Sequence, residues 1–298
     1  MGRELSKTYS VAKDIFTSAD ELLGFPISRL CWDGPEADLN DTINTQPALL
    51  IHSVASLMVF REVFPGFSPT FLAGHSMGEI SAIFAAGSLS FPEALKLVRR
   101  RGELMRQSGE IAPGGMAAIL GLDIPTLDKI CAEATIFAGE KDEIVQVAND
   151  NCPGQVVISG SRAALNQAII LAQSAGARRA ILLAVSIAAH SPLMSYTQDE
   201  FNLAVNSAPL LDPSIPVISN VAAQPMLHSD EIRTDLQAQL THRVRWTESI
   251  EYMIRRGVTT FLEFGSGSVL TGLLKRINTQ AQGIPIGSPQ DFEKLIAV

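Results

Sequence analysis

The sequence has few cysteines, and their spacing gives no sign of a metal site or a disulfide framework. Its 298 residues include three, Cys31, Cys131 and Cys152, which lie far apart and form no C-x-x-C pair. Structural zinc sites and small disulfide-rich folds both need closely patterned cysteines. We therefore expect no metal, and we expect these residues to be buried thiols of a protein in the reducing cytoplasm.

A basic excess and long apolar runs are also missing. The chain has 23 lysine and arginine residues against 31 aspartate and glutamate residues, and its net charge is −8. Its longest basic block is the triplet at 99–101, which argues against nucleic acid as a partner. No uninterrupted apolar stretch reaches the roughly 18 residues of a membrane span, and residues 1–10 are polar rather than signal-like. The expectation is a soluble, cytoplasmic protein without a membrane partner.

What the sequence does contain is a glycine-rich motif around Ser76. Residues 74–79 read GHSMGE, follow the short apolar run 70–73 and precede an apolar helical pattern. This is a G-x-S-x-G nucleophile elbow in the strand, turn and helix context that gives the motif its meaning. We expect Gly74 and Gly78 both to be needed, because a serine on so sharp a turn is strained and leaves no room for a nearby Cβ atom. An ordinary glycine-rich turn is the alternative interpretation.

The same turn predicts half of an oxyanion hole. A helix that begins directly after Ser76 leaves its first N–H groups without partners in the helix. The backbone N–H of Met77 would then point into the space above Ser76 and could donate to a developing oxyanion. The motif therefore predicts a nucleophile and one oxyanion donor within five residues.

Helices and strands alternate along the rest of the chain. Residues 116–183 are predicted as strand (116–120), helix (125–134), strand (143–148), strand (155–159), helix (161–175) and strand (178–183). This β-α-β-β-α-β order is the signature of a ferredoxin-like unit, here inside a longer α/β chain. We therefore divide the chain into a core, residues 1–114 and 184–298, and an inserted subdomain, residues 115–183. The elements predicted for the core are helices at 4–23, 48–60, 92–107, 193–206, 230–240, 247–256 and 268–277, and strands at 217–220 and 260–264.

A serine hydroxyl is a poor nucleophile at neutral pH and needs a base within hydrogen-bonding reach. His190 follows the small residues 186–189 and precedes Pro192 in a predicted loop after a strand, a setting in which catalytic histidines occur. His75, beside Ser76, is predicted to point into the sheet. Packing or surface roles are more typical of the remaining histidines, His52, His228 and His242. His190 is thus the candidate base.

Arg101 lies 25 residues after Ser76, in a predicted helix. An arginine can hold a carboxylate through two parallel hydrogen bonds, which lysine cannot reproduce. The alternative is a solvated basic helix face shared with Arg99 and Arg100.

Short strings with a common order are spread over residues 1–278. They are 46–50 (QPALL), 74–79 (GHSMGE), 101–102 (RG), 115–119 (GMAAI), Asn149 and Asn151 with 153–160 (PGQVVISG), His190, 245–246 (RW) and 269–273 (VLTGL). Together they resemble the malonyl-CoA:acyl carrier protein transacylases, the acyltransferases of bacterial fatty acid synthesis and of polyketide synthases. The resemblance implies an α/β-hydrolase-like core with a parallel sheet and an inserted ferredoxin-like (βαββαβ) subdomain.

The resemblance also implies residue roles. Ser76 resembles the acylated nucleophile and His190 its general base, while Arg101 resembles the arginine that grips the malonyl carboxylate. Gln239 resembles the residue whose backbone carbonyl orients the histidine in place of a triad aspartate, and Met77 is the further substrate-binding residue. The implied reaction moves a malonyl group from malonyl-CoA to the phosphopantetheine thiol of acyl carrier protein through a malonyl-serine intermediate, without metal or cofactor.

Departures from the family pattern keep other functions open. Family members usually open with a strand and a Gly-Gln-Gly-Ser-Gln turn that supplies the second oxyanion donor, whereas this sequence begins at Met1. We therefore expect the 298-residue form to be weakly active and prone to associate. Residues 186–189 match neither tetrapeptide that marks malonyl or methylmalonyl choice, so the preference rests on Arg101, Met77 and overall similarity. The alternatives are a proofreading serine acyl hydrolase of the same fold and a truncated, inactive homologue.

Overall fold

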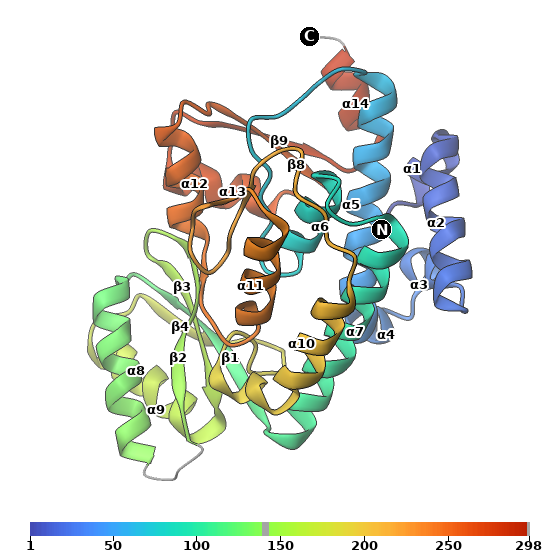
Figure 1. Cartoon of the computed structure of the whole chain (residues 1–298). Coiled ribbons are helices and arrows are strands. Elements are labelled where there is room, and N and C mark those ends of the chain that lie inside the picture. The colour runs from blue at the N-terminus through green and yellow to red at the C-terminus, as the bar shows by residue number, and fades with distance from the viewer. Residues whose placement is uncertain (139–142, 297–298) are drawn as a thin grey trace.

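The computed structural model describes residues 1–138 and 143–296 as an α/β protein (Figure 1). The chain begins with helices α1 (Arg3–Thr8), α2 (Ser10–Leu23), α3 (Ile27–Asp33) and α4 (Glu36–Asn40). The sequence predicted a single helix over 4–23. It is interrupted because Tyr9 has extended backbone angles (φ −119°, ψ 126°), and the Tyr9 ring packs against that of Phe292.

The long helix α5 (Thr42–Val63) passes through the interior of the larger part of the molecule. It begins earlier than predicted, because the Asp41 side chain caps it by accepting from the N–H of Ile43. Pro47 removes one helical N–H, and Arg99 Nη1 donates to the Ile43 carbonyl that this leaves free (3.2 Å). Among the described residues α5 is the one helix long and apolar enough to cross a membrane, but 61% of that stretch is buried inside the protein. It is therefore best explained as a core helix.

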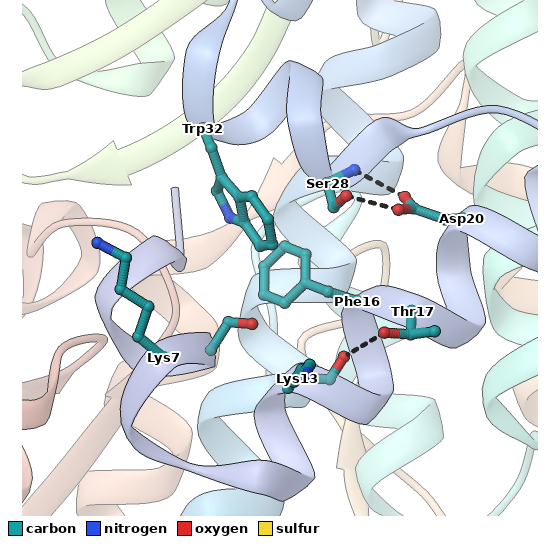
Figure 2. A pocket seen from close by; sticks show the side chains of 8 residues that line it. Lys7, Lys13, Phe16, Thr17, Asp20, Ser28 and Trp32 are labelled. Carbon is teal, nitrogen blue, oxygen red and sulfur yellow. Dashed lines mark hydrogen bonds between the residues drawn. The ribbon is translucent and has the colours of Figure 1, made fainter.

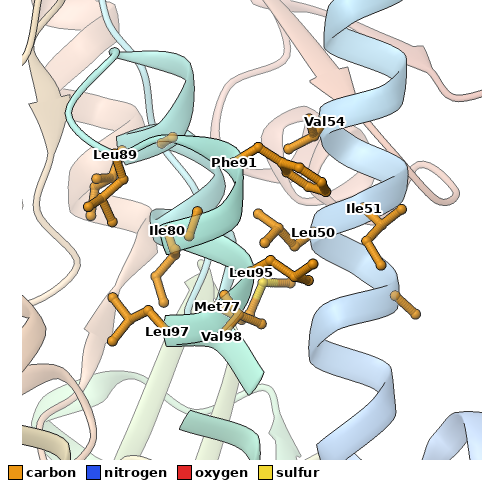
Figure 3. Packing of buried hydrophobic residues seen from close by; sticks show 14 of the residues in the cluster. Leu50, Ile51, Val54, Met77, Ile80, Leu89, Phe91, Leu95, Leu97 and Val98 are labelled. Atoms are coloured by element: carbon orange, nitrogen blue, oxygen red, sulfur yellow. The ribbon is translucent and has the colours of Figure 1, made fainter. Parts of the chain in front are cut away.

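Helix α6 (Gly78–Ala85) and helix α7 (Phe91–Ile111) pack beside α5. Figure 3 shows their apolar side chains interlocking in the main hydrophobic cluster, among them Leu50, Val54, Ile80, Phe91, Leu95 and Val98. This packing fixes the start of α6, and with it the turn that carries Ser76.

Outside the five-stranded sheet described below, few strands pair in parallel. β8 (Thr260–Phe264) pairs in parallel with β9 (Gln282–Ile286), whereas β5 (Val217–Ile218) and β6 (Pro225–Met226) are antiparallel. The strand predicted before the elbow is reduced to one parallel bridge between Leu72 and Val217. It goes no further because the Asn220 side chain, rather than a neighbouring strand, donates to the carbonyl of Gly74 (2.7 Å).

A five-stranded sheet forms the second region. Its first four strands are β1 (Gly114–Leu120), β2 (Val145–Cys152), β3 (Gln155–Ser161) and β4 (Arg179–Leu182), and they alternate with α8 (Ile124–Ala138) and α9 (Arg162–Ser174) in the predicted order. The spatial order is β4-β1-β3-β2-β7, where the two-residue strand β7 (Val244–Arg245) lies parallel to β2 and was not predicted. The division into a core and an inserted subdomain, at 115–183, stays a prediction.

The remaining helices follow the sheet. The predicted helix at 193–206 begins as a 3₁₀ segment, η1 (Pro192–Thr197), and continues as α10 (Gln198–Ser207). Next come α11 (Ser229–Gln239), α12 (Trp246–Arg255) and α13 (Val269–Ile277). The strand β9 and the helix α14 (Pro289–Ile296) close the chain and were not predicted.

Candidate active site

The predicted nucleophile and base both have strained backbones. In the described part of the chain, three residues other than glycine have positive φ: Ser76 (53°), His190 (56°) and Ala223 (54°). A left-handed conformation costs a non-glycine residue about 1–3 kcal/mol and persists where the surrounding structure enforces it. The expected strain at Ser76 is confirmed, and His190 shares it.

The two glycines of the elbow are not equally necessary. A Cβ atom on Gly74 would lie 1.9 Å from the carbonyl oxygen of Gly78, so no other residue fits there. For Gly78 the steric prediction was wrong. It already belongs to α6, and no described atom outside its own helix and neighbours would come within 4 Å of an added Cβ.

Ser76, His190 and Gln239 form a line of hydrogen bonds. Ser76 Oγ lies 2.7 Å from His190 Nε2, and His190 Nδ1 lies 2.8 Å from the backbone oxygen of Gln239. A carbonyl oxygen can only accept, so Nδ1 must carry the hydrogen and Nε2 has its lone pair toward the serine hydroxyl. The arrangement gives Ser76 a base in the correct tautomer.

His190 is buried, and its surroundings hold it neutral. Burial, and next the charge of Arg101, lowers the pKa of His190 to about 3, although the hydrogen bond to Gln239 acts in the opposite direction. The backbone is anchored as well, because Gln146 Nε2 donates to the carbonyls of His190 (2.7 Å) and Thr241 (2.9 Å). The imidazole is thus fixed in place and unprotonated at neutral pH, with the Nε2 lone pair free to face the hydroxyl of Ser76.

Arg101 does not belong to a solvated basic face. It is 1% exposed, whereas Arg99 and Arg100 pair with Glu103 at the surface of α7. The guanidinium is oriented by neutral acceptors and by the serine: Gln46 Oε1 (2.6 Å from Nη1), Gln239 Oε1 (2.9 Å from Nη2) and Ser76 Oγ (3.1 Å from Nη2). The solvated-face interpretation was therefore wrong for this residue.

The charge of Arg101 has no direct counter-ion. Within residues 1–138 and 143–296 it forms no salt bridge, and its hydrogen-bond acceptors are uncharged. Burial lowers its pKa to about 10, while Glu79 acts in the opposite direction, so it remains a cation at neutral pH. A buried cation without a carboxylate partner, in contact with Ser76, is an electrostatically incomplete site that an anionic group would complete.

Met77 reaches the site through its backbone. Its side chain is buried in the main hydrophobic cluster (Figure 3). No acceptor is recorded for its N–H among the described residues, while the next N–H groups bond within the turn, Gly78 to His75 and Glu79 to Ser76. The Met77 N–H is therefore available to a developing oxyanion, as its place at the helix start predicts.

Two residues around the elbow were missed from the sequence. Asn220 Oδ1 accepts from the N–H of Ser76 (2.7 Å), and Glu79 accepts from the N–H of Asn220 (2.7 Å). Both are buried. The available signals were weak: a charged residue in the first turn of an apolar helix, and an amide at the end of an apolar strand.

The other histidines have structural roles or lie at the surface. His75 Nε2 bonds Asn151 Oδ1 (2.8 Å), and its ring packs edge-on against Trp246. His52 is buried and bonds Ser266 Oγ (2.7 Å) and the carbonyl of Gly287 (2.9 Å). Of the packing or surface roles predicted for His52, the structure shows packing, and His75 contacts Asn151 of β2 and Trp246. The exposed histidines are His228 and His242.

One surface pocket lies away from these residues, between α1, α2 and α3 (Figure 2). It is lined by Lys7, Lys13, Phe16, Asp20 and Trp32, among others, and contains none of the predicted site residues. Asp20 there already accepts two hydrogen bonds from Ser28. The pocket is not part of the constellation around Ser76.

Known proteins resemble the chain over nearly its full length. The family model of the acyl transferase domain matches residues 1–287. A malonyl CoA-acyl carrier protein transacylase of Bacillus subtilis is 43% identical over 296 residues, 99% of this chain and 92% of its own. One of the same name from Haemophilus influenzae is 41% identical over 289 residues, 97% of this chain and 91% of its own.

Solved structures agree with this. An acyl carrier protein S-malonyltransferase from Vibrio cholerae superposes with a TM-score of 0.94 at 40% identity, over 99% of this chain and 94% of that chain. A malonyl-transacylase solved in complex with its type II PKS acyl-carrier protein superposes with a TM-score of 0.94 at 37% identity, over 100% of this chain and 94% of that one. These likenesses confirm the α/β fold class.

Proposed function

The chain belongs to the acyl transferase family, and on that premise we propose that it transfers a malonyl group from malonyl-CoA to the phosphopantetheine thiol of an acyl carrier protein. The observation that carries the proposal is the buried guanidinium of Arg101, which has no carboxylate partner among the described residues and lies 3.1 Å from Ser76 Oγ. A malonyl thioester has both groups that this site lacks, a carbonyl for the serine and a carboxylate for the arginine.

In the first half-reaction Ser76 is acylated. Its Oγ attacks the thioester carbonyl carbon while His190 Nε2, 2.7 Å away, takes the hydroxyl proton. The Met77 N–H donates to the oxyanion that forms. The carbon–sulfur bond then breaks, His190 returns the proton to the departing CoA sulfur, and a malonyl ester remains on Ser76.

The second half-reaction runs the same steps in reverse. His190 takes the proton from the phosphopantetheine thiol, whose sulfur attacks the ester carbonyl. The bond to Ser76 Oγ breaks, and His190 reprotonates that oxygen. Over the two half-reactions together, the thioester of CoA is broken and a thioester of similar energy is formed on the carrier protein, so the overall transfer is close to reversible.

The bound malonyl group also acts on the base. The charge of Arg101 is one cause of the low pKa of His190. A malonyl carboxylate paired with Arg101 offsets that charge and raises the pKa of His190 toward its ordinary range. The correct substrate thereby strengthens the base that activates Ser76.

A serine acyl hydrolase is the second candidate, since it would use the same Ser76 and His190. It differs in the acceptor, because water rather than a thiol would take the acyl group. A carboxylate clamp has no use in the hydrolysis of simple acyl chains, so Arg101 favours the transferase.

The decisive experiment follows a label. The protein is mixed with malonyl-CoA labelled in the malonyl group and with holo acyl carrier protein, and the label is traced to carrier protein, free malonate or unreacted CoA ester. We expect most of it on the carrier protein. Release mainly as malonate would identify a hydrolase, and label that stays on CoA would identify an inactive homologue.

We also propose that the protein acts in the cytoplasm, in fatty acid or polyketide synthesis, both of which consume malonyl thioesters of a carrier protein. All three cysteines are buried free thiols, which fits a reducing compartment. Burial raises the pKa of Cys31 to about 11 and that of Cys131 to about 12, so neither is a reactive thiolate.

A further inference from the structure

A carboxylate without a part in the proposed chemistry lies behind the elbow. Glu79, in the first turn of α6, is 0% exposed. Its Oε1 accepts from the backbone N–H (2.7 Å) and from Nδ2 (3.0 Å) of Asn220. Its Oε2 accepts from Nε2 of Gln239. The Glu79 side chain therefore joins two amides that lie 141 and 160 residues away from it in the chain.

The first amide holds the elbow. Asn220 Nδ2 donates to the carbonyl of Gly74 (2.7 Å), and Asn220 Oδ1 accepts from the N–H of Ser76 (2.7 Å). These bonds fix the backbone on both sides of His75. They hold Ser76 at a φ of 53°, which it would not adopt without such support.

The second amide holds the arginine. Gln239 Nε2 donates to the carbonyl of Ser76 (3.1 Å), and Gln239 Oε1 accepts from Nη2 (2.9 Å) and Nε (3.2 Å) of Arg101. The backbone oxygen of the same residue accepts from His190. Gln239 thus connects Arg101, Ser76 and His190.

The two ends of a side-chain amide have nearly the same shape but opposite hydrogen-bonding character, so a neighbour must decide which end faces which group. Carboxylate oxygens accept, so Glu79 turns both NH₂ groups toward itself. The two amide oxygens then face the Ser76 N–H and the Arg101 guanidinium. In the reverse orientation, donors would meet donors in a buried site.

We propose that Glu79 is a positioning residue that sets the orientation of both amides, and so holds the nucleophile through Asn220 and the malonyl-binding arginine through Gln239. The inference rests on the proposed function for the role of Arg101. It goes beyond that function in assigning the geometry of the site to a residue that touches no reacting atom.

Asp235 supports this arrangement. It is buried, its Oδ1 accepts from the N–H of Val221 (3.3 Å) and from the Ser219 hydroxyl, and its Oδ2 has no partner among the described residues. Burial raises the pKa of both carboxyls. Burial, and next the charge of Asp235, raises the pKa of Glu79 well above its usual range, so the two carboxyls together hold one proton, and each oxygen of Glu79 keeps a lone pair for the amide donors.

The test is Glu79→Gln, which keeps the shape but places an NH₂ group against one of the donors. Two rates are measured: labelling of Ser76 by a fluorophosphonate that carries no carboxylate, and acylation by malonyl-CoA relative to acetyl-CoA. We expect labelling to slow by about 10- to 100-fold, and the malonyl to acetyl ratio to fall by about 10-fold or more.

The matched control is Glu263→Gln. Glu263 also accepts two N–H groups, those of Leu270 (2.9 Å) and Thr271 (2.6 Å), but it caps α13 and has no recorded bond to the elbow in the described ranges. Its variant is expected to melt lower than the wild type, with the labelling rate and the malonyl to acetyl ratio unchanged.

Asn220→Ala removes the link from Glu79 to Ser76 but keeps the link to Arg101 through Gln239. It also tests the proposal if Glu79→Gln does not fold. It is expected to slow labelling while leaving the malonyl to acetyl ratio unchanged, because Arg101 is held through Gln239. The inference is overturned by a Glu79→Gln protein with both readouts as in the wild type, or by an Asn220→Ala protein that labels at the wild-type rate. Wild-type protein that reacts with the fluorophosphonate but takes no malonyl group contradicts the proposed function, while the labelling rates still decide on Glu79.

Discussion

The interior around Ser76 and the interior of the five-stranded sheet differ in the polarity of their buried side chains. Behind the elbow, buried charged and amide side chains satisfy one another, among them Arg101, Glu79, His190 and Gln239. The cluster between the sheet and helices α8 and α9 is apolar, with residues such as Ile119, Leu127, Ile158 and Leu165. Burying the polar groups around Ser76 costs free energy of folding but orients the reactive side chains, whereas the apolar cluster of the sheet contributes to the free energy of folding. Substitutions in the two regions should therefore change different observables.

The largest effect is expected from Ser76→Ala. Without the hydroxyl no malonyl ester forms, whereas the fold should persist because a half-buried hydroxyl contributes little to stability. Intact-mass spectrometry after brief exposure to malonyl-CoA should show the added malonyl mass in the wild type and none in the variant. An adduct that persists in Ser76→Ala would place the nucleophile elsewhere.

Arg101→Ala should change selectivity. Loss of the charge leaves the malonyl carboxylate buried without a partner, at a cost of about 3–5 kcal/mol, while an acetyl group loses no such contact. The malonyl to acetyl ratio of initial rates should fall by a factor of hundreds or more. The control is Arg100→Ala on the same helix, where the side chain pairs with Glu103 and Glu200 at the surface and the ratio should hold. An unchanged ratio in Arg101→Ala would remove Arg101 from substrate binding.

A substitution in the apolar cluster of the sheet should lower stability and leave substrate selectivity unchanged. Ile158, in β3, is fully buried, and Ile158→Ala should lower the free energy of unfolding by about 2–5 kcal/mol through lost contacts and a cavity. The measurement is denaturant unfolding, with Ile181→Ala as the control because that side chain is exposed on β4. Below the unfolding transition, the malonyl to acetyl ratio should match the wild type. A ratio that moves with Ile158 would mean that the two regions are coupled.

The smallest effect concerns pH. Because the pKa of His190 is lowered to about 3 in the fold, the imidazole stays neutral well below its ordinary pKa of 6.5. The rate of Ser76 acylation by acetyl-CoA, which leaves Arg101 unpaired, should therefore show no fall centred near pH 6.5. An inflection there would show that His190 titrates normally.

The lowered pKa of His190 should also make the free energy of unfolding depend on pH. The unfolded chain binds a proton at His190 below pH 6.5, while the fold resists it down to about pH 3. His190 therefore contributes stability that is present above pH 6.5 and is lost as the pH falls toward 3. In thermal melts over this window, the melting temperature of the wild type should therefore fall more steeply with falling pH than that of His190→Gln, which lacks the titrating group.

Local patterns predicted the sheet region well. The alternation of apolar residues gave the β-α-β-β-α-β order, because each strand and helix there shows its own period over consecutive residues. The two-residue strand β7 escaped prediction because its register comes from β2, nearly a hundred residues earlier in the chain. Around Ser76 the pattern predicted a longer strand than the structure has, since the Asn220 side chain replaces the backbone ladder there.

The sequence by itself located the elbow, since Gly74, which the turn requires, and the helix that starts at Gly78 follow from neighbouring residues, whereas distant Asn220 holds the backbone of Ser76. It also marked Ser76 as the nucleophile candidate. Only the tertiary structure decided that Arg101 is buried rather than solvated. The acceptors that orient it, Gln46 and Gln239, lie 55 and 138 residues away, and Asn220 lies 144 residues from Ser76. Hydrogen bonds across such separations follow from the packing of whole helices, and no local period in the sequence encodes them.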